Sequence, residues 1–213
     1  MENKKAYIFD VNGVLIDSTP SFVSAILSYL DTHKVKYGAD ILSEISSLGY
    51  LGIAKHFISL GVDVPLYTLV EELKQVTLRA YAFDIKEKKG ALTKLLELKN
   101  KGYKLAAVTQ SPHIMSDSAL IRLNMYELFD GIFSSDDLGL DKNNPKFYTI
   151  VCEKLRINPE DAILFDDSLS SLLAAREAGL TVYGVYDVSS YKDTVKIKEI
   201  SEGYLKYISE ITE

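Results

Sequence analysis

The sequence predicts an α/β fold in which a doubly wound parallel sheet carries an inserted all-helical domain. In the second half of the chain, short apolar runs alternate with amphipathic segments, which is typical of strands joined by crossover helices. Residues 18–88 break this alternation and contain patterns of helical spacing. A chain of 213 residues can form one core and a small second unit. We therefore expect residues 1–17 and 89–213 to form the α/β core and residues 18–88 to form the helical domain.

The core elements are predicted from apolar runs and from helical periodicity. Residues 6–9 form an apolar run that stops at Asp10, and residues 104–108 form a second run that stops at Thr109. The helix before the second run is expected to end at Gly102, because glycine commonly follows a helix C-terminus. The remaining strands are predicted at residues 131–133, 162–165 and 181–185, and the core helices at 92–101, 148–155 and 169–178.

The helical domain is predicted from four amphipathic segments that glycines and a proline separate. Pro20 suits the start of the first segment, since proline is favoured in the first turn of a helix. No strand pattern is evident between these segments. The four helices are expected at residues 20–30, 41–48, 53–60 and 67–81, and residues 191–213 are expected to be an ordinary amphipathic ending.

Composition narrows the classes of protein. The net charge of -6 argues against a nucleic-acid partner. No apolar stretch approaches the length that spans a bilayer, so no membrane partner is expected. Cys152 is the single cysteine, which rules out an intrachain disulfide and a cysteine metal cluster. We expect a cytoplasmic protein that is a monomer or a homodimer.

Polar residues that can carry chemistry follow three of the predicted strands. Asp10, Thr109 and Asp166 stand where the apolar runs stop. Alone, each has an ordinary structural explanation, as a turn residue or as a helix N-cap. In a parallel sheet, however, the carboxyl ends of the strands point the same way and line the crevice where ligands bind. The sequence therefore predicts that these side chains converge.

Four separated motifs resemble those of the haloacid dehalogenase superfamily, and they occur in the family's order. The first resembles Asp-x-Asp-Gly-x-[Leu/Val]-x-Asp-Ser, the second an apolar strand that ends in Thr or Ser, the third Lys-Pro-x-Pro-x-x-Tyr, and the fourth a pair of acids before a helix. The matching residues are 10–18, 108–112, 142–148, and 165–168 with 174–179. The branch of phosphoglycolate phosphatases and β-phosphoglucomutases is the most similar, although Phe22 stands near where the mutases carry a histidine.

The resemblance implies a Rossmann-like core, a helical cap and a hydrolase with a phosphatase reaction. The expected substrate is a small phosphorylated metabolite. Asp10 would attack phosphorus and form an aspartyl-phosphate, Thr109 would hydrogen-bond a phosphoryl oxygen, and Lys142 would neutralise charge there. Asn143 replaces the family's usual proline, which leaves the choice between Lys142 and Lys146 open.

The resemblance also implies a Mg²⁺ cofactor. Its expected ligands are the Asp10 carboxylate, the backbone carbonyl of Asn12 and Asp167, with Asp166 nearby. A dianionic phosphate beside three carboxylates is repelled unless a cation lies between them. The expected substrate-binding residues are Thr109, Gln110, Ser111 and Lys142, and His113 is the one histidine near this group in the sequence.

Asn12 departs from the family, whose phosphatases carry an aspartate there as general acid and base. An amide cannot titrate in this range and can only hydrogen-bond. The chain could be a slow phosphatase, or one whose leaving groups need no proton. It could be a haloacid dehalogenase or a phosphonate hydrolase, which also lack this aspartate, or a non-catalytic protein that binds a phosphoryl ligand. The asparagine could also be engineered, an artefact, or partly converted to an acid by deamidation, because Gly13 follows it.

Overall fold

The computed structural model describes residues 4–45 and 48–212 and divides the chain into two units. One unit is Met1–Thr19 with Ile85–Glu213, and the other is Pro20–Asp84. Two short strands, β2 (Ile16–Asp17) and β3 (Lys86–Glu87), pair antiparallel beside the points where the chain passes between the units. The sequence placed the second boundary after residue 88; because β3 pairs with β2, the chain rejoins the core at Ile85.

The core unit is built around a six-stranded parallel sheet, which confirms the predicted fold class. Its order is β5-β4-β1-β6-β7-β8, and every neighbouring pair is parallel. The strand β8 was not expected, because its three residues are only half-buried and lie in the segment assigned to an amphipathic tail. The bounds are β1 (Ala6–Asp10), β4 (Lys104–Thr109), β5 (Gly131–Ser134), β6 (Ala162–Asp166), β7 (Thr181–Val185) and β8 (Gly203–Leu205).

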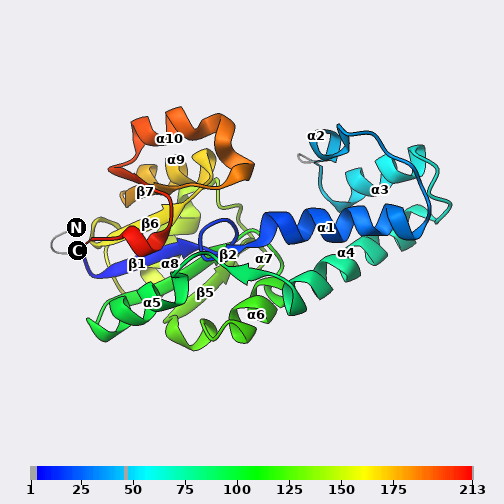
Figure 1. Cartoon of the computed structure of the whole chain (residues 1–213). Coiled ribbons are helices and arrows are strands. Elements are labelled where there is room, and N and C mark those ends of the chain that lie inside the picture. The colour runs from blue at the N-terminus through cyan, green and yellow to red at the C-terminus, as the bar shows by residue number, and fades with distance from the viewer. Residues whose placement is uncertain (1–3, 46–47, 213) are drawn as a thin grey trace. The chain divides into compact units, whose positions relative to one another are not determined.

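The central strand β1 is buried along its whole length, which explains why its sequence is continuously apolar instead of alternating. One face of the sheet, which includes Ile8 and Leu164, shares a core with residues of α8 and α9. On the other face Phe9 stacks against Phe165, with ring centroids 5.2 Å apart. The core helices, packed around the strands in Figure 1, are α5 (Ala91–Asn100), α6 (His113–Arg122), α7 (Ser135–Leu138), α8 (Pro145–Leu155), α9 (Leu169–Glu177) and α10 (Thr194–Ile200).

The strand order determines where a ligand can bind. From β1 the chain passes to β4 and β5 on one side, then crosses to β6, β7 and β8 on the other side. The switch point therefore lies between β1 and β6, and ligands of open α/β sheets bind outside the carboxyl ends of the strands at that point. Asp10 and Asp166 are the last residues of these two strands.

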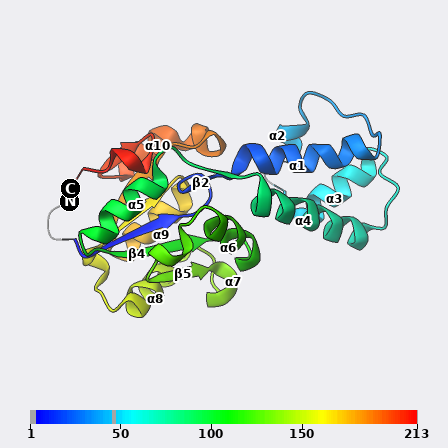
Figure 2. The same ribbon diagram turned by 60° about the horizontal axis from the view of Figure 1, so that its bottom comes forward.

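The helical insertion (residues 20–84) has a core of its own. Ile26 and Leu30 of α1 pack with Phe57 of α3 and with Leu69 and Leu73 of α4. In Figure 2, α1 and α4 run side by side, and every regular element at residues 20–45 and 48–84 is helical. Part of the predicted helix 41–48 falls on residues 46–47, outside the described residues. The helices are α1 (Ser18–Thr32), α2 (Ile41–Ile45), α3 (Tyr50–Ser59) and α4 (Leu66–Phe83).

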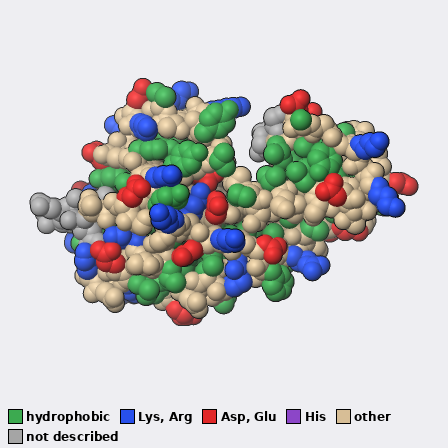
Figure 3. Space-filling view, viewed as in Figure 1, with side chains coloured by type: hydrophobic (Ala, Val, Ile, Leu, Met, Phe, Trp, Pro, Cys, Tyr) green, Lys and Arg blue, Asp and Glu red, His purple; other side chains and the backbone are tan. Residues whose placement is uncertain are grey.

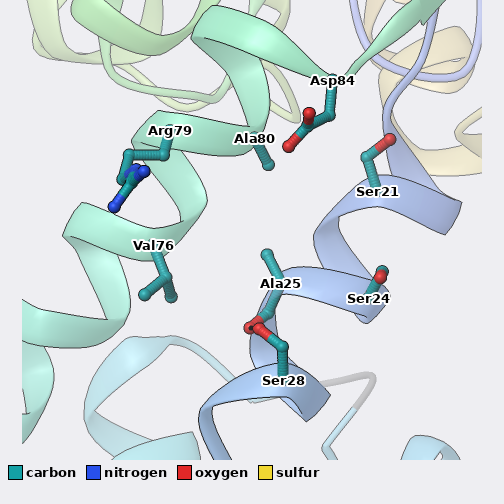
Figure 4. Close-up of a pocket in the computed structure, with 8 residues that line it drawn as sticks. All are labelled: Ser21, Ser24, Ala25, Ser28, Val76, Arg79, Ala80 and Asp84. Atoms are coloured by element: carbon teal, nitrogen blue, oxygen red, sulfur yellow. Dashed lines mark hydrogen bonds between the residues drawn. The ribbon is translucent and has the colours of Figure 1, made fainter. Parts of the chain in front are cut away.

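Between α1 and α4 lies a pocket of about 370 Å³. Figure 4 shows that both helices line it with small or polar side chains. The lining residues of the pocket are Ser21, Ser24, Ala25, Ser28, Val76, Arg79, Ala80 and Asp84.

On the face of the molecule seen in Figure 3, lysine and arginine are interspersed with acidic side chains and gather into no basic patch. Over the described residues, the helices are too short or too polar to cross a membrane.

Candidate active site

A polar pocket of about 260 Å³ lies at the carboxyl ends of the central strands. The three strand-end residues of the sequence analysis close β1, β4 and β6, which are neighbours in the sheet. Asp10 and Asp166 line the pocket, whereas Thr109 is fully buried and does not. The lining residues are Asp10, Asn12, Gly13, Thr19, Gln110, Ser111, Lys142, Asp166, Asp167, Ser168, Ser171 and Ser189, all from the core unit.

Three carboxylates form the centre of this pocket. Asp10, Asp166 and Asp167 each offer an oxygen within 4.8 Å of the others' oxygens. The turn after β6 holds this arrangement, because Asp166 Oδ1 accepts a hydrogen bond of 2.8 Å from the backbone N–H of Ser168. Oxygen donors in such a group match the ligands that Mg²⁺ takes in proteins. The pair at 166 and 167 and the distant Asp10 are therefore brought together by the strand order.

Lys142 is the cation of the site. Its ammonium donates a hydrogen bond to Asp10 Oδ1 and lies 2.8 Å from Asp166 Oδ2, with 3% of the residue exposed. Lys146, the alternative from the sequence, is exposed. The turn before α8 explains the difference: Asp141 accepts from the N–H of Asn143, and the helix then begins at Pro145, so Lys146 already belongs to the outer surface of α8.

The pocket carries an excess of negative charge. Burial raises the pKa of Asp10 well above its ordinary value, and the carboxylates of Asp166 and Asp167 raise it further, while Lys142 opposes them. Burial, then Asp166 and Asp187, raise the pKa of Asp167 to about 7. Burial alone would lower the pKa of Lys142, but Asp10 and Asp166 outweigh it, and the net shift is upward. A further cation would relieve this repulsion.

Asn12 faces the hydroxyl groups at the end of β4. Its Nδ2 donates to Ser111 Oγ at 3.0 Å and to Thr109 Oγ1 at 3.4 Å. Thr109 Oγ1 also accepts from the N–H of Ser111 at 3.0 Å. Asn12, Thr109 and Ser111 thus form one hydrogen-bonded rim. The Nε2 of Gln110 donates instead to Asp141 Oδ1 at 2.8 Å, in the turn before α8.

Gly13 lets the β1–β2 turn approach the acidic cluster. Its φ of +82° is a conformation that glycine adopts readily, and its N–H donates to the carbonyl of Ile16 at 2.9 Å. A Cβ added here would lie 3.1 Å from the Asp167 carboxyl and 3.2 Å from Asp187 Cγ. Any other side chain would therefore press on both acids.

Two residues of this neighbourhood were missed by the sequence analysis. Asp187 is buried, with 1% exposed, and Ser189 lies between it and Asp167. A signal was available, because both residues lie in the loop that follows the predicted strand 181–185, near the kind of strand end that singled out Asp10. His113, by contrast, does not line the pocket; its ring nitrogens face Asp117 and Asp137.

Comparison with known proteins identifies the family. The model of the haloacid dehalogenase-like hydrolases matches residues 7–185. The chain belongs to this family. The predicted resemblance is thereby confirmed, and the protein is a hydrolase by membership.

Relatives in this family carry related names. The chain is 29% identical over 183 residues to a phosphorylated carbohydrates phosphatase of Thermotoga maritima, covering 85% of each protein. It is 28% identical over 211 residues to a phosphoglycolate phosphatase of Psychrobacter arcticus, covering 95% of this chain and 92% of that one. A crystal structure from Thermotoga maritima, provisionally described as a β-phosphoglucomutase, superimposes with a TM-score of 0.85 at 26% identity, covering 95% of this chain and 94% of that one.

Proposed function

We propose that this haloacid dehalogenase-like hydrolase is a Mg²⁺-dependent phosphomonoester hydrolase that acts on a small phosphorylated metabolite through an aspartyl-phosphate on Asp10. The observation that carries the proposal is the buried group of Asp10, Asp166 and Asp167 with Lys142 among them, at the switch point of the sheet. Relatives named as phosphatases of phosphoglycolate and of phosphorylated carbohydrates support the reaction and the substrate class.

The donor set fits Mg²⁺. All three acids offer oxygen, and among the residues that line the pocket Lys142 is the one cation that faces them. Asp10 and Asp167 would hold the ion with the backbone carbonyl of Asn12, and Asp166 would support them. When bound, Mg²⁺ supplies positive charge between the acids and the phosphate dianion. A carbonyl ligand at position 12 is unaffected by the change of its side chain.

Asp10 is the nucleophile in this proposal. Its carboxylate attacks phosphorus in line, the bond from phosphorus to the alkoxide oxygen breaks, and the acyl phosphate is then hydrolysed by water. Lys142 neutralises charge on the phosphoryl oxygens as a compact cation. Thr109 does not line the pocket, so in this proposal it acts through Asn12 and Ser111, which both donate hydrogen bonds to its hydroxyl. Ser111 and Gln110 line the pocket beside it.

Asn12 limits the protonation of the leaving group. Its amide stands at the rim, but it holds no proton that it can transfer to an alkoxide. General acid–base assistance contributes about 10²–10⁴-fold to such reactions. The chain would therefore favour esters whose alcohol leaves easily without a proton, and it would hydrolyse alkyl phosphates slowly.

The proposal is tested with p-nitrophenyl phosphate, whose leaving group needs little acid assistance. We expect release of p-nitrophenolate that requires Mg²⁺, is removed by EDTA and is abolished by Asp10→Ala. Lys146→Met is the matched control for Lys142→Met, because one lysine is exposed and the other contacts Asp10. Only the Lys142 variant should lose activity.

Other results of these assays would support one of the alternative functions instead. Binding of inorganic phosphate without turnover, in this chain and in Asn12→Asp, would make it a non-catalytic phosphoryl-binding protein. Metal-independent release of chloride from a haloacid would make it a dehalogenase. Activity that survives Asp10→Ala would remove the aspartyl-phosphate from the mechanism.

A further inference from the structure

A second charged cluster lies beside the acidic site. We call Asp17, Lys88, Asp187 and Ser189 the Asp187 cluster. The ammonium of Lys88 lies 2.6 Å from Asp187 Oδ2 and 3.3 Å from Asp17 Oδ1. Asp187 Oδ1 accepts a hydrogen bond of 2.9 Å from the N–H of Ser189 and lies 2.7 Å from Ser189 Oγ. The carboxylate of Asp187 is thus buried but fully partnered.

The partners keep Asp187 charged. Burial acts to raise its pKa, but hydrogen bonds from Lys88 and from Ser189 outweigh it, and the net shift is downward. The pKa of Lys88 shifts upward for the same reason, although burial opposes it. A carboxylate held in this way is a fixed negative charge with a fixed position, since both oxygens are engaged.

The cluster is connected to the proposed metal ligand Asp167 in two ways, directly through Ser189 and indirectly through Gly13. Ser189 Oγ lies 3.2 Å from Asp167 Oδ2, so one hydroxyl stands between the two carboxylates. Gly13 packs against both, because the position of its missing Cβ is 3.1 Å from the Asp167 carboxyl and 3.2 Å from Asp187 Cγ. A shift of Asp187 would therefore be felt at Asp167 through a hydroxyl group and through a closely packed turn.

The cluster also contains residues next to both places where the chain passes between the core and the helical insertion. Asp17 ends β2, and Lys88 follows β3, where its N–H donates to the carbonyl of Leu15 at 2.9 Å. Thr19, the last residue before the insertion, places Oγ1 at 3.4 Å from Asp187 Oδ1. Lys88 therefore joins the β2–β3 pair to the loop after β7 by charge, in addition to the contact that Thr19 makes.

We propose that the Asp187 cluster is a positioning element, which orients Asp167 for Mg²⁺ and links occupancy of that site to the order of the β2–β3 pair. The inference rests on the proposed Mg²⁺ site. Groups that hydrogen-bond a metal ligand set its orientation, and their loss weakens metal binding about 10–100-fold. Because coupling between two sites is reciprocal, bound Mg²⁺ must also stabilise whatever holds Asp167.

The first measurement is the dissociation constant of Mg²⁺, by calorimetry on the full chain. We expect Lys88→Met and Ser189→Ala to raise it about tenfold. Lys86→Met is the matched control, because Lys86 lies on β3 two residues before Lys88, is exposed and does not belong to the cluster. This variant should bind Mg²⁺ like the unchanged protein. Lys88→Arg should restore most of the affinity.

The direction in which Lys88→Met changes the dissociation constant of Mg²⁺ separates a positioning role from simple electrostatics. Removal of a cation near the acids would strengthen Mg²⁺ binding if charge alone mattered. Weaker binding is the result that positioning predicts. Ser189→Ala changes no charge and removes only one hydroxyl, so it carries the test if Lys88→Met does not fold.

The second measurement is amide hydrogen exchange. In the unchanged protein, Mg²⁺ should slow exchange of the backbone amides at residues 16–17 and 86–88 at least threefold. This protection should be lost in Lys88→Met and retained in Lys86→Met. Wild-type affinity in both Lys88→Met and Ser189→Ala, with unaltered protection, would overturn the coupling alone. Failure of the unchanged protein to bind Mg²⁺ would instead overturn the proposed metal site and the inference with it.

Discussion

The variant Asn12→Asp tests whether the absence of a general acid at position 12 limits the proposed reaction. In Asn12→Asp, an oxygen replaces Nδ2 at 3.0 Å from Ser111 Oγ and 3.4 Å from Thr109 Oγ1. Both hydroxyls can rotate to donate to it, so the substitution should not disturb the rim. The new carboxyl would line the same pocket as Asp10, Asp166 and Asp167, and a general acid is most effective when its pKa lies near the working pH.

The expected gain depends on the leaving group. Acid assistance of about 10²–10⁴-fold corresponds to about 3–5 kcal/mol of transition-state stabilisation. We expect kcat of Asn12→Asp on an alkyl phosphate to rise by at least about 100-fold. The kcat on p-nitrophenyl phosphate should change little, because this leaving group needs no proton.

The assay is phosphate release from the two esters at saturating Mg²⁺. The double variant Asp10→Ala with Asn12→Asp is the control and should be inactive on both. An equal gain on the two esters would show that the new carboxyl acts through binding or metal affinity. No gain on the alkyl phosphate, with activity on p-nitrophenyl phosphate intact, would refute the role assigned to position 12.

Three further predictions follow from the site. Lys142→Met should lower the free energy of unfolding of the metal-free protein, measured by urea denaturation at pH 8, by about 3–5 kcal/mol, because two buried carboxylates lose their cation. Lys146→Met, at an exposed position, should change the free energy of unfolding by less than about 0.5 kcal/mol. Burial and the neighbouring carboxylates raise the pKa of Asp167 to about 7, so below pH 7 Mg²⁺ must displace a proton from Asp167. The Mg²⁺ affinity measured by calorimetry should therefore rise about tenfold per pH unit up to pH 7 and then level off. An affinity that does not change with pH would contradict the raised pKa. Asn12 should deamidate slowly in the native protein and faster in urea, because a hydrogen bond to the carbonyl of Ile16 holds the attacking N–H of Gly13 in the native protein. Peptide mapping measures the two rates, and equal rates would count against this protection.

The strands that carry the site could be predicted because their pattern is local. β1 and β6 are covered on both faces, so each is a continuous apolar run that ends at an aspartate. The principle that ligands bind at the carboxyl ends of parallel strands then brought Asp10, Thr109 and Asp166 together without any knowledge of distance.

The remaining features depend on tertiary contacts that no local pattern encodes. The three residues of β8 are half-buried and become a strand only by pairing with β7. Lys88 and Asp187 are 99 positions apart in the chain, and each alone resembles an ordinary surface charge. The choice between Lys142 and Lys146 depended on the turn before α8, where Asp141 and Asn144 accept backbone hydrogen bonds.

The antiparallel pairing of β2 and β3 has a consequence for the exchange of domains. Ile16 pairs with Glu87 and Asp17 with Lys86, so the helical insertion leaves and rejoins the core at adjacent backbone positions. The core therefore experiences the insertion as one closed loop, whose length affects the entropy of closure only logarithmically, by about 1 kcal/mol for a threefold change. Insertions at such sites are readily lengthened, shortened or replaced. The sheet and its acidic pocket can thus remain constant while the inserted domain diverges.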